Sequence, residues 1–196
     1  GAQMIRHTIK ATTYDLKWNI DPKKVQKVEK WPESFAPYLR AEDQAVVVND
    51  KVKQVLSEIL PELKDPFDNV SQIIAWTNAN MKYTHDNASL AASSQHAIEN
   101  RAGHCSDYHG LCAAFGRVLG YPTRVTYGIN PFPKASPSHC KLEVFLPPYG
   151  WVSFDVSETQ KLVEQINKDE KLSAEDKLQL VAAANKRLMS GYRDNT

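Results

Sequence analysis

The sequence predicts an α+β protein in which helices pack on an antiparallel sheet and a cysteine begins one of the helices. Three observations support this class. Helical periodicity dominates residues 42–119, three short alternating segments follow between residues 123 and 156, and helical periodicity returns after residue 159. A run of helices followed by a run of strands is typical of α+β proteins rather than of repeating βαβ units.

The first 41 residues are expected to form a strand and an irregular segment. Apolar and polar side chains alternate over residues 4–18, which predicts a strand that ends near Asp21-Pro22. Residues 22–42 are irregular because the Trp31-Pro32 and Ala36-Pro37 steps disfavour long regular elements. We expect residues 42–196 to hold the core and the C-terminal helices, with both parts in one compact domain.

Four helices are predicted before the sheet from apolar side chains at helical spacing. They cover about residues 42–60, 66–82, 94–100 and 105–119. Asp65-Pro66 marks the start of the second helix, and Ser93 or Ser94 caps the third. Gly120 and Pro122 end the fourth, because glycine accepts the left-handed conformation and proline cannot continue a helix.

Strands are predicted at residues 123–129, 139–146 and 151–156. Six of the eleven prolines lie between residues 122 and 148, in the connections around these strands. Gly150 is expected to turn the last two strands into a hairpin. Helices near residues 159–170 and 173–188 complete the chain.

Composition excludes several classes of protein. With 196 residues, 42% apolar and 24% charged, the chain has the make-up of a globular protein that needs no metal or disulfide to form a core. The net charge of +1 and the absence of a basic block give no indication of a nucleic-acid partner. No apolar run approaches the roughly 20 residues of a membrane span. The three cysteines form no CxxC pair, so neither a zinc knuckle nor a thioredoxin motif is indicated.

Cys105 is the candidate nucleophile because it stands at the predicted start of a helix. The unpaired N–H groups and the positive end of the helix dipole favour a thiolate there. Cys112 lies deeper on the apolar side of the same helix and is interpreted as a packing residue. Cys140 shares a strand face with Leu142 and is interpreted as structural for the same reason.

His139 and Asp155 are the candidate base and its orienting acid. If the strands at 139–146 and 151–156 form a hairpin, opposite residues have numbers that add to about 294–297, and 139 and 155 add to 294. Their Cβ atoms would then lie roughly 5 Å apart. A thiol, an imidazole and a carboxylate are the groups that nucleophilic acyl transfer requires. Taken alone, His139 would be a surface histidine and Asp155 a strand-end cap.

An oxyanion formed by such a reaction needs hydrogen-bond donors. The backbone N–H of Cys105 is the first candidate. The second is the Trp76 indole, the amide of Asn78 or Asn80, or the Tyr83 hydroxyl, and Trp76 also fits a core position. The sequence leaves this choice open.

Two segments resemble the transglutaminase-like superfamily, whose core is related to papain. The segment GHCSDYHGLCAAFGRVLGYPTRVTYG is similar to a family pattern of Gly-x-Cys-x-Asp, an apolar helix, Arg-x-Leu-Gly-x-Pro-x-Arg and a strand. HCKLEVFLPPYGWVSFD is similar to the family's histidine strand and the hairpin after it. The resemblance covers about residues 70–156. It implies a papain-like fold with Cys105 as nucleophile, His139 as general base and acid, and Asp155 as the orienting residue.

Lys141 is a departure from the family pattern, because members commonly carry Ala-Trp where this chain has Cys140-Lys141. We expect Lys141 to alter the cleft wall and the choice of substrate. No acidic cluster resembles the calcium sites of animal transglutaminases, so no metal or other cofactor is expected.

The expected reaction is attack of Cys105 on a peptide or carboxamide carbonyl through a thioester. Hydrolysis, as in a peptidase or amidase, is favoured over amine transfer to a protein glutamine. A non-enzymatic interaction module that keeps the fold is the alternative from another class. N-glycan amidase activity is disfavoured because the chain lacks paired cysteines. The expected partner is a peptide or protein substrate, and an extracytoplasmic location in a bacterium is favoured over the cytoplasm.

Overall fold

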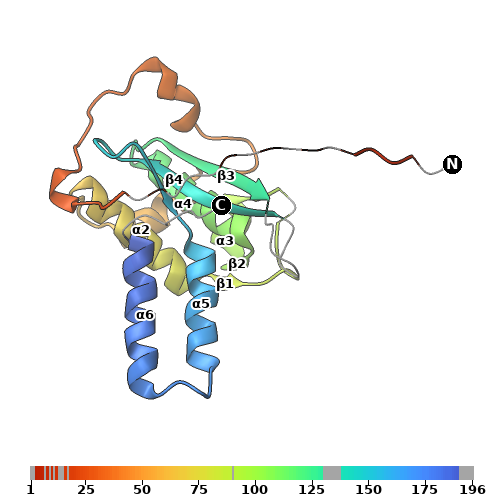
Figure 1. Ribbon diagram of the computed structural model, residues 1–196. Coiled ribbons are helices and arrows are strands. Elements are labelled where there is room, and N and C mark those ends of the chain that lie inside the picture. Colours follow the sequence, from red (N-terminus) through yellow and green to blue (C-terminus); the bar gives the residue numbers. More distant parts are fainter. Residues whose placement is uncertain are drawn as a thin grey trace.

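The computed structural model describes residues 3–6, 8, 10, 12, 16, 18–89, 91–129 and 138–189 of the 196-residue chain. Helices and an antiparallel sheet form one mixed structure, as the α+β prediction requires (Figure 1). The strands of this antiparallel sheet are β3 (Thr123–Ile129), β4 (Ser138–Phe145) and β5 (Trp151–Phe154), in the order β3-β4-β5. The helices are α1 (Asp50–Ile59), α2 (Pro66–Asn80), α3 (Ser94–Asn100), α4 (Cys105–Val118), α5 (Val156–Lys168) and α6 (Ala174–Met189).

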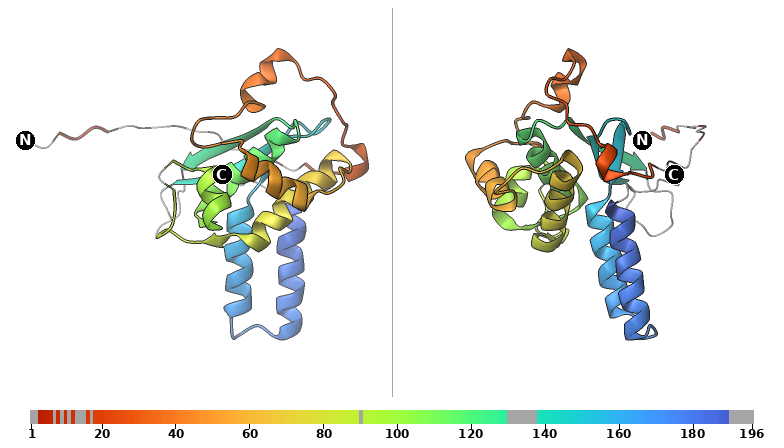
Figure 2. Two further views of the ribbon diagram at one scale, coloured as in Figure 1. Left: turned by 180° about the vertical axis from the view of Figure 1, so that it is seen from behind. Right: turned by 90° about the vertical axis from the view of Figure 1, so that its left-hand side faces the viewer.

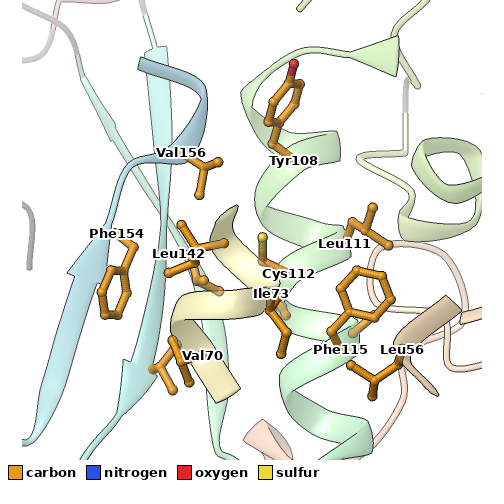
Figure 3. Close-up of a cluster of buried hydrophobic side chains, with 14 of the residues drawn as sticks. Leu56, Val70, Ile73, Tyr108, Leu111, Cys112, Phe115, Leu142, Phe154 and Val156 are labelled. Carbon is orange, nitrogen blue, oxygen red and sulfur yellow. The ribbon is translucent and has the colours of Figure 1, made fainter. Parts of the chain in front are cut away.

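Helix α4 is the centre of the fold. It packs against β3 and β4 on one side and against α1, α2 and α3 on the other. Figure 3 shows side chains of α2, α4, β4 and β5 meeting in this core, among them Ile73, Phe115, Leu142 and Phe154. At Gly116 an added Cβ would lie 2.5 Å from Thr123 Cγ2, so the absence of a side chain allows the start of β3 to approach the helix closely. The start of α4, where Cys105 stands, is therefore held by the main core.

Helix α1 is shorter than predicted. The sequence indicated a helix over about residues 42–60, whereas α1 begins at Asp50. The side chain of Asn49 accepts a hydrogen bond from the Val52 backbone N–H at 2.9 Å, which fixes the start of the helix there. Helices α2 and α3 begin at the predicted residues, and Ser93 caps α3 by accepting from His96 N–H.

The strand predicted over residues 4–18 is not found among the residues of that segment that the structure describes. Leu16 alone forms a bridge there, and residues 7, 9, 11, 13–15 and 17 lie outside the description. Met4 and Ile5 are 87% and 82% exposed, so this part of the segment has no sheet to cover its apolar side chains.

The segment before residue 42 covers the face of the sheet that α4 leaves open. Trp31, Phe35 and Tyr38, in and beside a short 3₁₀ turn over Glu33–Tyr38, pack against Phe145 and Trp151 of β4 and β5. Ring centroids of Phe35 and Phe145 are 4.7 Å apart. Residues before 42 thus contribute to the packing of the sheet, and the division of the chain at residue 41 stays a prediction.

Helices α5 and α6 pair with each other and project from one end of the molecule (Figures 1 and 2). Helix α5 begins three residues before the predicted start at 159, because Asp155 Oδ1 accepts the Glu158 N–H at 3.0 Å. None of the described helices combines the length and the apolar content that a bilayer crossing requires.

Candidate active site

Cys105 is the first residue of α4, and the start of this helix is fixed by Asp107. One carboxylate oxygen of Asp107 accepts hydrogen bonds from the backbone N–H groups of His104 at 3.0 Å and Ser89 at 3.2 Å. Gly103, with φ of +155°, makes room for that carboxylate, since an added Cβ would lie 2.4 Å from it. Cys105 is half-buried, and its thiol stands where the helix dipole favours a negative charge.

His139 and Asp155 are brought together by the β4–β5 hairpin. Leu142 pairs with Phe154 in the register, so opposite residue numbers add to 296, within the predicted range of 294–297. Strand β5 ends at Phe154, and Asp155 turns back toward the histidine. His139 Nε2 lies 2.6 Å from Asp155 Oδ2. A carboxylate only accepts, so Nε2 carries the hydrogen and Nδ1 is left to face the thiol.

The electrostatics of these groups favour a thiolate–imidazolium pair. Burial on its own lowers the pKa of His139, but hydrogen bonds to Asp155 and Cys105 outweigh it and raise the pKa to about 10. A hydrogen bond with Cys140 lowers the pKa of Cys105, burial opposes this, and His139 lowers it further. Burial of Asp155, which is 1% exposed, is outweighed by the bond to His139, so its pKa is lowered.

Among the side chains proposed as oxyanion donors, Tyr83 is one on which the charge of Cys105 acts. It belongs to β1 (Lys82–Tyr83), which pairs in parallel with β2 (Ala102–Gly103) just before Cys105. Burial raises the pKa of the Tyr83 hydroxyl; the charge on Lys161 opposes this, whereas the charge on Cys105 adds to it. The Lys161 ammonium lies 4.8 Å from the centre of the Tyr83 ring. The charges of Cys105 and Lys161 therefore both act on this tyrosine.

The other proposed cleft residues have contacts elsewhere. The Trp76 ring packs on Phe115 with centroids 5.7 Å apart and has the Arg101 guanidinium 4.3 Å above it. The Asn80 side chain donates to the Trp76 carbonyl at 2.9 Å. The Asn78 backbone carbonyl accepts from Gln160 Nε2 at 2.7 Å, and the side-chain Oδ1 of Asn78 is buried without a hydrogen-bond partner. Lys141, half-buried on β4, is close enough for its charge to act on His109.

Three residues near the thiol were missed or set aside in the sequence. His109 is fully buried one turn along α4 from Cys105, and the i, i+4 spacing was the available signal. Cys140, interpreted from sequence as structural, is buried as expected but also interacts with Cys105. Tyr127, which pairs with Cys140 in the sheet, is 65% exposed and feels the charge of Cys105. No local pattern predicts the last contact.

An open pocket of about 310 Å³ lies between the segment before α1, helix α4 and strand β3, and Cys105, His139 and Asp155 are not among its lining residues. Ser106, the residue after Cys105, is part of its wall, and Tyr127 lines it from β3. Arg117 and Arg124 also line the pocket, and they pair with Glu42 and Glu143 respectively. In the described part of the chain, no group of three or more His, Cys, Asp or Glu side chains is arranged to hold a metal ion.

Comparison with known proteins identifies the family of this chain. The family model of the transglutaminase-like superfamily matches residues 53–156, which is more than half of the chain. The chain belongs to the transglutaminase-like superfamily. This stretch runs from α1 to the first residue of α5 and contains Cys105, His139 and Asp155. A search of curated proteins found no match.

Two solved structures share the fold of this chain. A candidate cysteine protease from Cytophaga hutchinsonii superposes with a TM-score of 0.59 and 22% identity, over 68% of this chain and 45% of that one. The periplasmic domain of TgpA from Pseudomonas aeruginosa gives a TM-score of 0.52 and 19% identity, over 77% of this chain and 52% of that one. The chain therefore spans about half the length of these two proteins.

Proposed function

We propose that this transglutaminase-like domain is a cysteine-dependent acyl-transfer enzyme that cleaves a peptide or carboxamide bond through a thioester. The observation that carries the proposal is the 2.6 Å contact between His139 Nε2 and Asp155 Oδ2. It fixes the imidazole with Nδ1 available to the Cys105 sulfur, which is the arrangement that a thiol nucleophile and its base require.

The reaction begins with attack of the Cys105 thiolate on the substrate carbonyl carbon. The proposed hydrogen-bond donors to the oxyanion that forms are the Cys105 backbone N–H and the Tyr83 hydroxyl. The His139 imidazolium gives its proton to the leaving nitrogen, the C–N bond breaks, and a thioester to Cys105 remains. Neutral His139 then takes a proton from water as the water attacks the thioester. Collapse of this second adduct releases the acid and restores the thiolate–imidazolium pair.

Water is the proposed acceptor, and the substrate is a peptide or protein. The similarity to a candidate cysteine protease is consistent with hydrolysis. An extracytoplasmic location is proposed by analogy with the TgpA domain, which is periplasmic.

The test uses a mixed peptide library with glutamine-containing members and an added primary amine. Wild-type protein is compared with Cys105→Ala and with Cys112→Ala, a control for loss of a buried thiol elsewhere on α4. We expect new peptide or carboxyl termini with wild type and Cys112→Ala, and none with Cys105→Ala. Incorporation of the amine instead of water would assign amine transfer. Equal products from wild type and Cys105→Ala, or no products from either, would contradict the enzyme and favour an interaction module.

A further inference from the structure

Strand β3 forms one edge of the three-stranded sheet, so part of its main chain faces away from β4 (Figure 1). The Phe145 N–H donates to the Pro122 carbonyl at 3.0 Å, next to the first pair of the two strands. In an antiparallel pair, residues that bond the partner strand alternate with residues whose N–H and C=O groups point outward. With the observed register, Val125 and Tyr127 therefore present their main-chain groups on the outer edge.

The two ends of this edge differ. At the start of β3, the outward carbonyl of Thr123 accepts a hydrogen bond from Arg117 Nη2 at 3.0 Å. Further along, the main-chain groups of Val125 and Tyr127 on the outer edge have no hydrogen-bond partner among the residues that the structure describes, and we call this part the free edge of β3. Tyr127 and Ile129 are 65% and 77% exposed. An exposed edge with unpaired groups is a template for another extended chain.

The pocket of about 310 Å³ lies against the free edge. Val125 and Tyr127 line it from β3, and Ser106 and Gly110 line it from the first turns of α4. Since Ser106 follows Cys105 in the chain, a peptide that leaves the pocket on this side is near the proposed nucleophile. Cys105 itself is not part of the wall. The pocket therefore suits a part of the substrate beside the bond that is cleaved, and not that bond itself.

The wall of the pocket carries more positive than negative charge. It contains the arginines Arg40, Arg117 and Arg124 and one acidic residue, Glu42. Arg117 is 7% exposed and pairs with Glu42 at 2.6 Å, and Arg124 pairs with Glu143. The guanidinium of Arg40, an exposed residue, has no ion-pair or hydrogen-bond partner within the described part of the chain. This guanidinium can meet a carboxylate that a ligand brings.

We propose that the free edge of β3 and the pocket beside it bind an extended segment of the peptide substrate, and that Arg40 selects an acidic side chain in this segment. The inference rests on the proposed function, in which Cys105 cleaves that peptide. The main-chain groups of Val125 and Tyr127 hold the segment as an added strand. Side chains of such a strand alternate between two faces, so every second one meets the pocket wall. The expected specificity is an acidic residue at a fixed position relative to the cleaved bond.

The first experiment selects binders from a synthetic library of random peptides and needs no catalysis. The bait is Cys105→Ala protein, which keeps the pocket but lacks the nucleophile. Two further baits add Arg40→Glu or, as a matched control, Lys171→Glu, which makes the same charge change at an exposed site between α5 and α6. We expect the first bait to enrich peptides with Asp or Glu at one position of the aligned sequences. Arg40→Glu should change this preference to Lys or Arg, and Lys171→Glu should leave it unchanged.

The second experiment tests the added strand with the best enriched peptide, and it changes the ligand so that the fold of the protein is unaffected. Each peptide bond is N-methylated in turn, and the Kd for Cys105→Ala protein is measured by fluorescence anisotropy. In an added antiparallel strand, every second N–H of the peptide bonds β3. We expect methylation at alternate positions of the bound segment to weaken binding about tenfold, and methylation between them to have little effect.

Three results decide between success and failure. A bait that enriches no peptide with an acidic residue, or a preference that Arg40→Glu does not alter, would overturn the role of Arg40. Equal losses from methylation at every position, or no loss at any, would rule out pairing with β3. Failure of the proposed function has a different signature, because wild-type protein would then bind the enriched peptides and leave them uncut.

Discussion

Asp155 accepts hydrogen bonds on both of its carboxylate oxygens: from His139 Nε2 on one, at 2.6 Å, and from the Glu158 backbone N–H on the other, at 3.0 Å. The same side chain thus orients the proposed base and caps helix α5. One buried residue therefore links the end of the hairpin to the start of α5. Because the two contacts use different carboxylate oxygens, a mutation can separate orientation of the base from capping of the helix.

Asp155→Asn should separate orientation of the base from capping. The Asn oxygen still caps α5, but its amide faces Nε2 and favours the wrong tautomer of His139. We expect kcat/KM to fall by about 10²–10⁴-fold. Asp155→Ala should lose a further stability of about 1 kcal/mol with the cap. Peptide hydrolysis and urea unfolding measure the two effects, and an active Asp155→Asn variant would contradict the role of the carboxylate.

Stability should depend on pH through the Cys105–His139 pair. Hydrogen bonds to Asp155 and Cys105 overcome burial and raise the pKa of His139 to about 10, while the pKa of Cys105 is lowered by Cys140 and His139. The folded pair holds one proton from mildly acidic pH up to about 10. The unfolded pair holds two protons below roughly pH 6.5, one up to roughly 8.5, and none above. Folding is therefore favoured most between these limits and less on either side.

The measurement for this pH dependence is urea unfolding of wild type and of a Cys105→Ala, His139→Gln double variant at pH 5.5, 7.5 and 9.5. Other titrating groups contribute nearly equally to both proteins and largely cancel in the difference. We expect the difference in the free energy of unfolding to be largest at pH 7.5. A difference that is constant with pH would contradict the charged pair.

Tyr83→Phe should separate oxyanion stabilisation from activation of the thiol. The change removes only the hydroxyl, so we expect kcat to fall by about 10²-fold while alkylation of Cys105 keeps its rate. Asn80→Ala is the matched control, because the Asn80 side chain bonds the Trp76 carbonyl and should leave kcat within about twofold of wild type. Equal activity of Tyr83→Phe and wild type would exclude the hydroxyl as a donor.

Gly103→Ala should disturb the start of α4. At φ of +155° an added Cβ lies 2.4 Å from the Asp107 carboxylate that caps the helix. We expect a loss of about 1–3 kcal/mol in the free energy of unfolding and slower alkylation of Cys105. Gly120→Ala is the control: its φ is also positive, at +76°, but nothing lies within 4 Å of the new Cβ. Equal losses from both variants would show that backbone strain alone, and not the contact with Asp107, decides the effect.

The predicted hairpin register is confirmed within its range, because it depends on local signals. The contact of His139 with Asp155 does not come from the direct cross-strand pairing that was predicted: pairs that add to 296 leave these two residues out of register, and Asp155 lies beyond β5 and caps α5. Gly150 and the alternation of two adjacent strands determine which residues lie opposite each other, and the observed pairs add to 296. The start of α4 at Cys105 is likewise confirmed. It follows from the interruption of the helical pattern at Arg101–His104 and from the apolar stripe that comes after it. The predicted start of helix α1 was wrong because a cap at Asn49 is not visible in periodicity. In the first segment, the described residues show no strand beyond the bridge at Leu16.

The sequence by itself determined the fold class, most of the helices and strands, and the three residues proposed to react, since periodicity, turn residues and motif spacing are local properties. The tertiary structure decided what surrounds them. It brought Tyr83 close to Cys105 through the β1–β2 pairing, gave Trp76 a packing role on Phe115, and placed His109 against Cys140. These contacts join residues 22 to 39 positions apart, and only the packing of α4 against the sheet and α2 brings them within reach of each other.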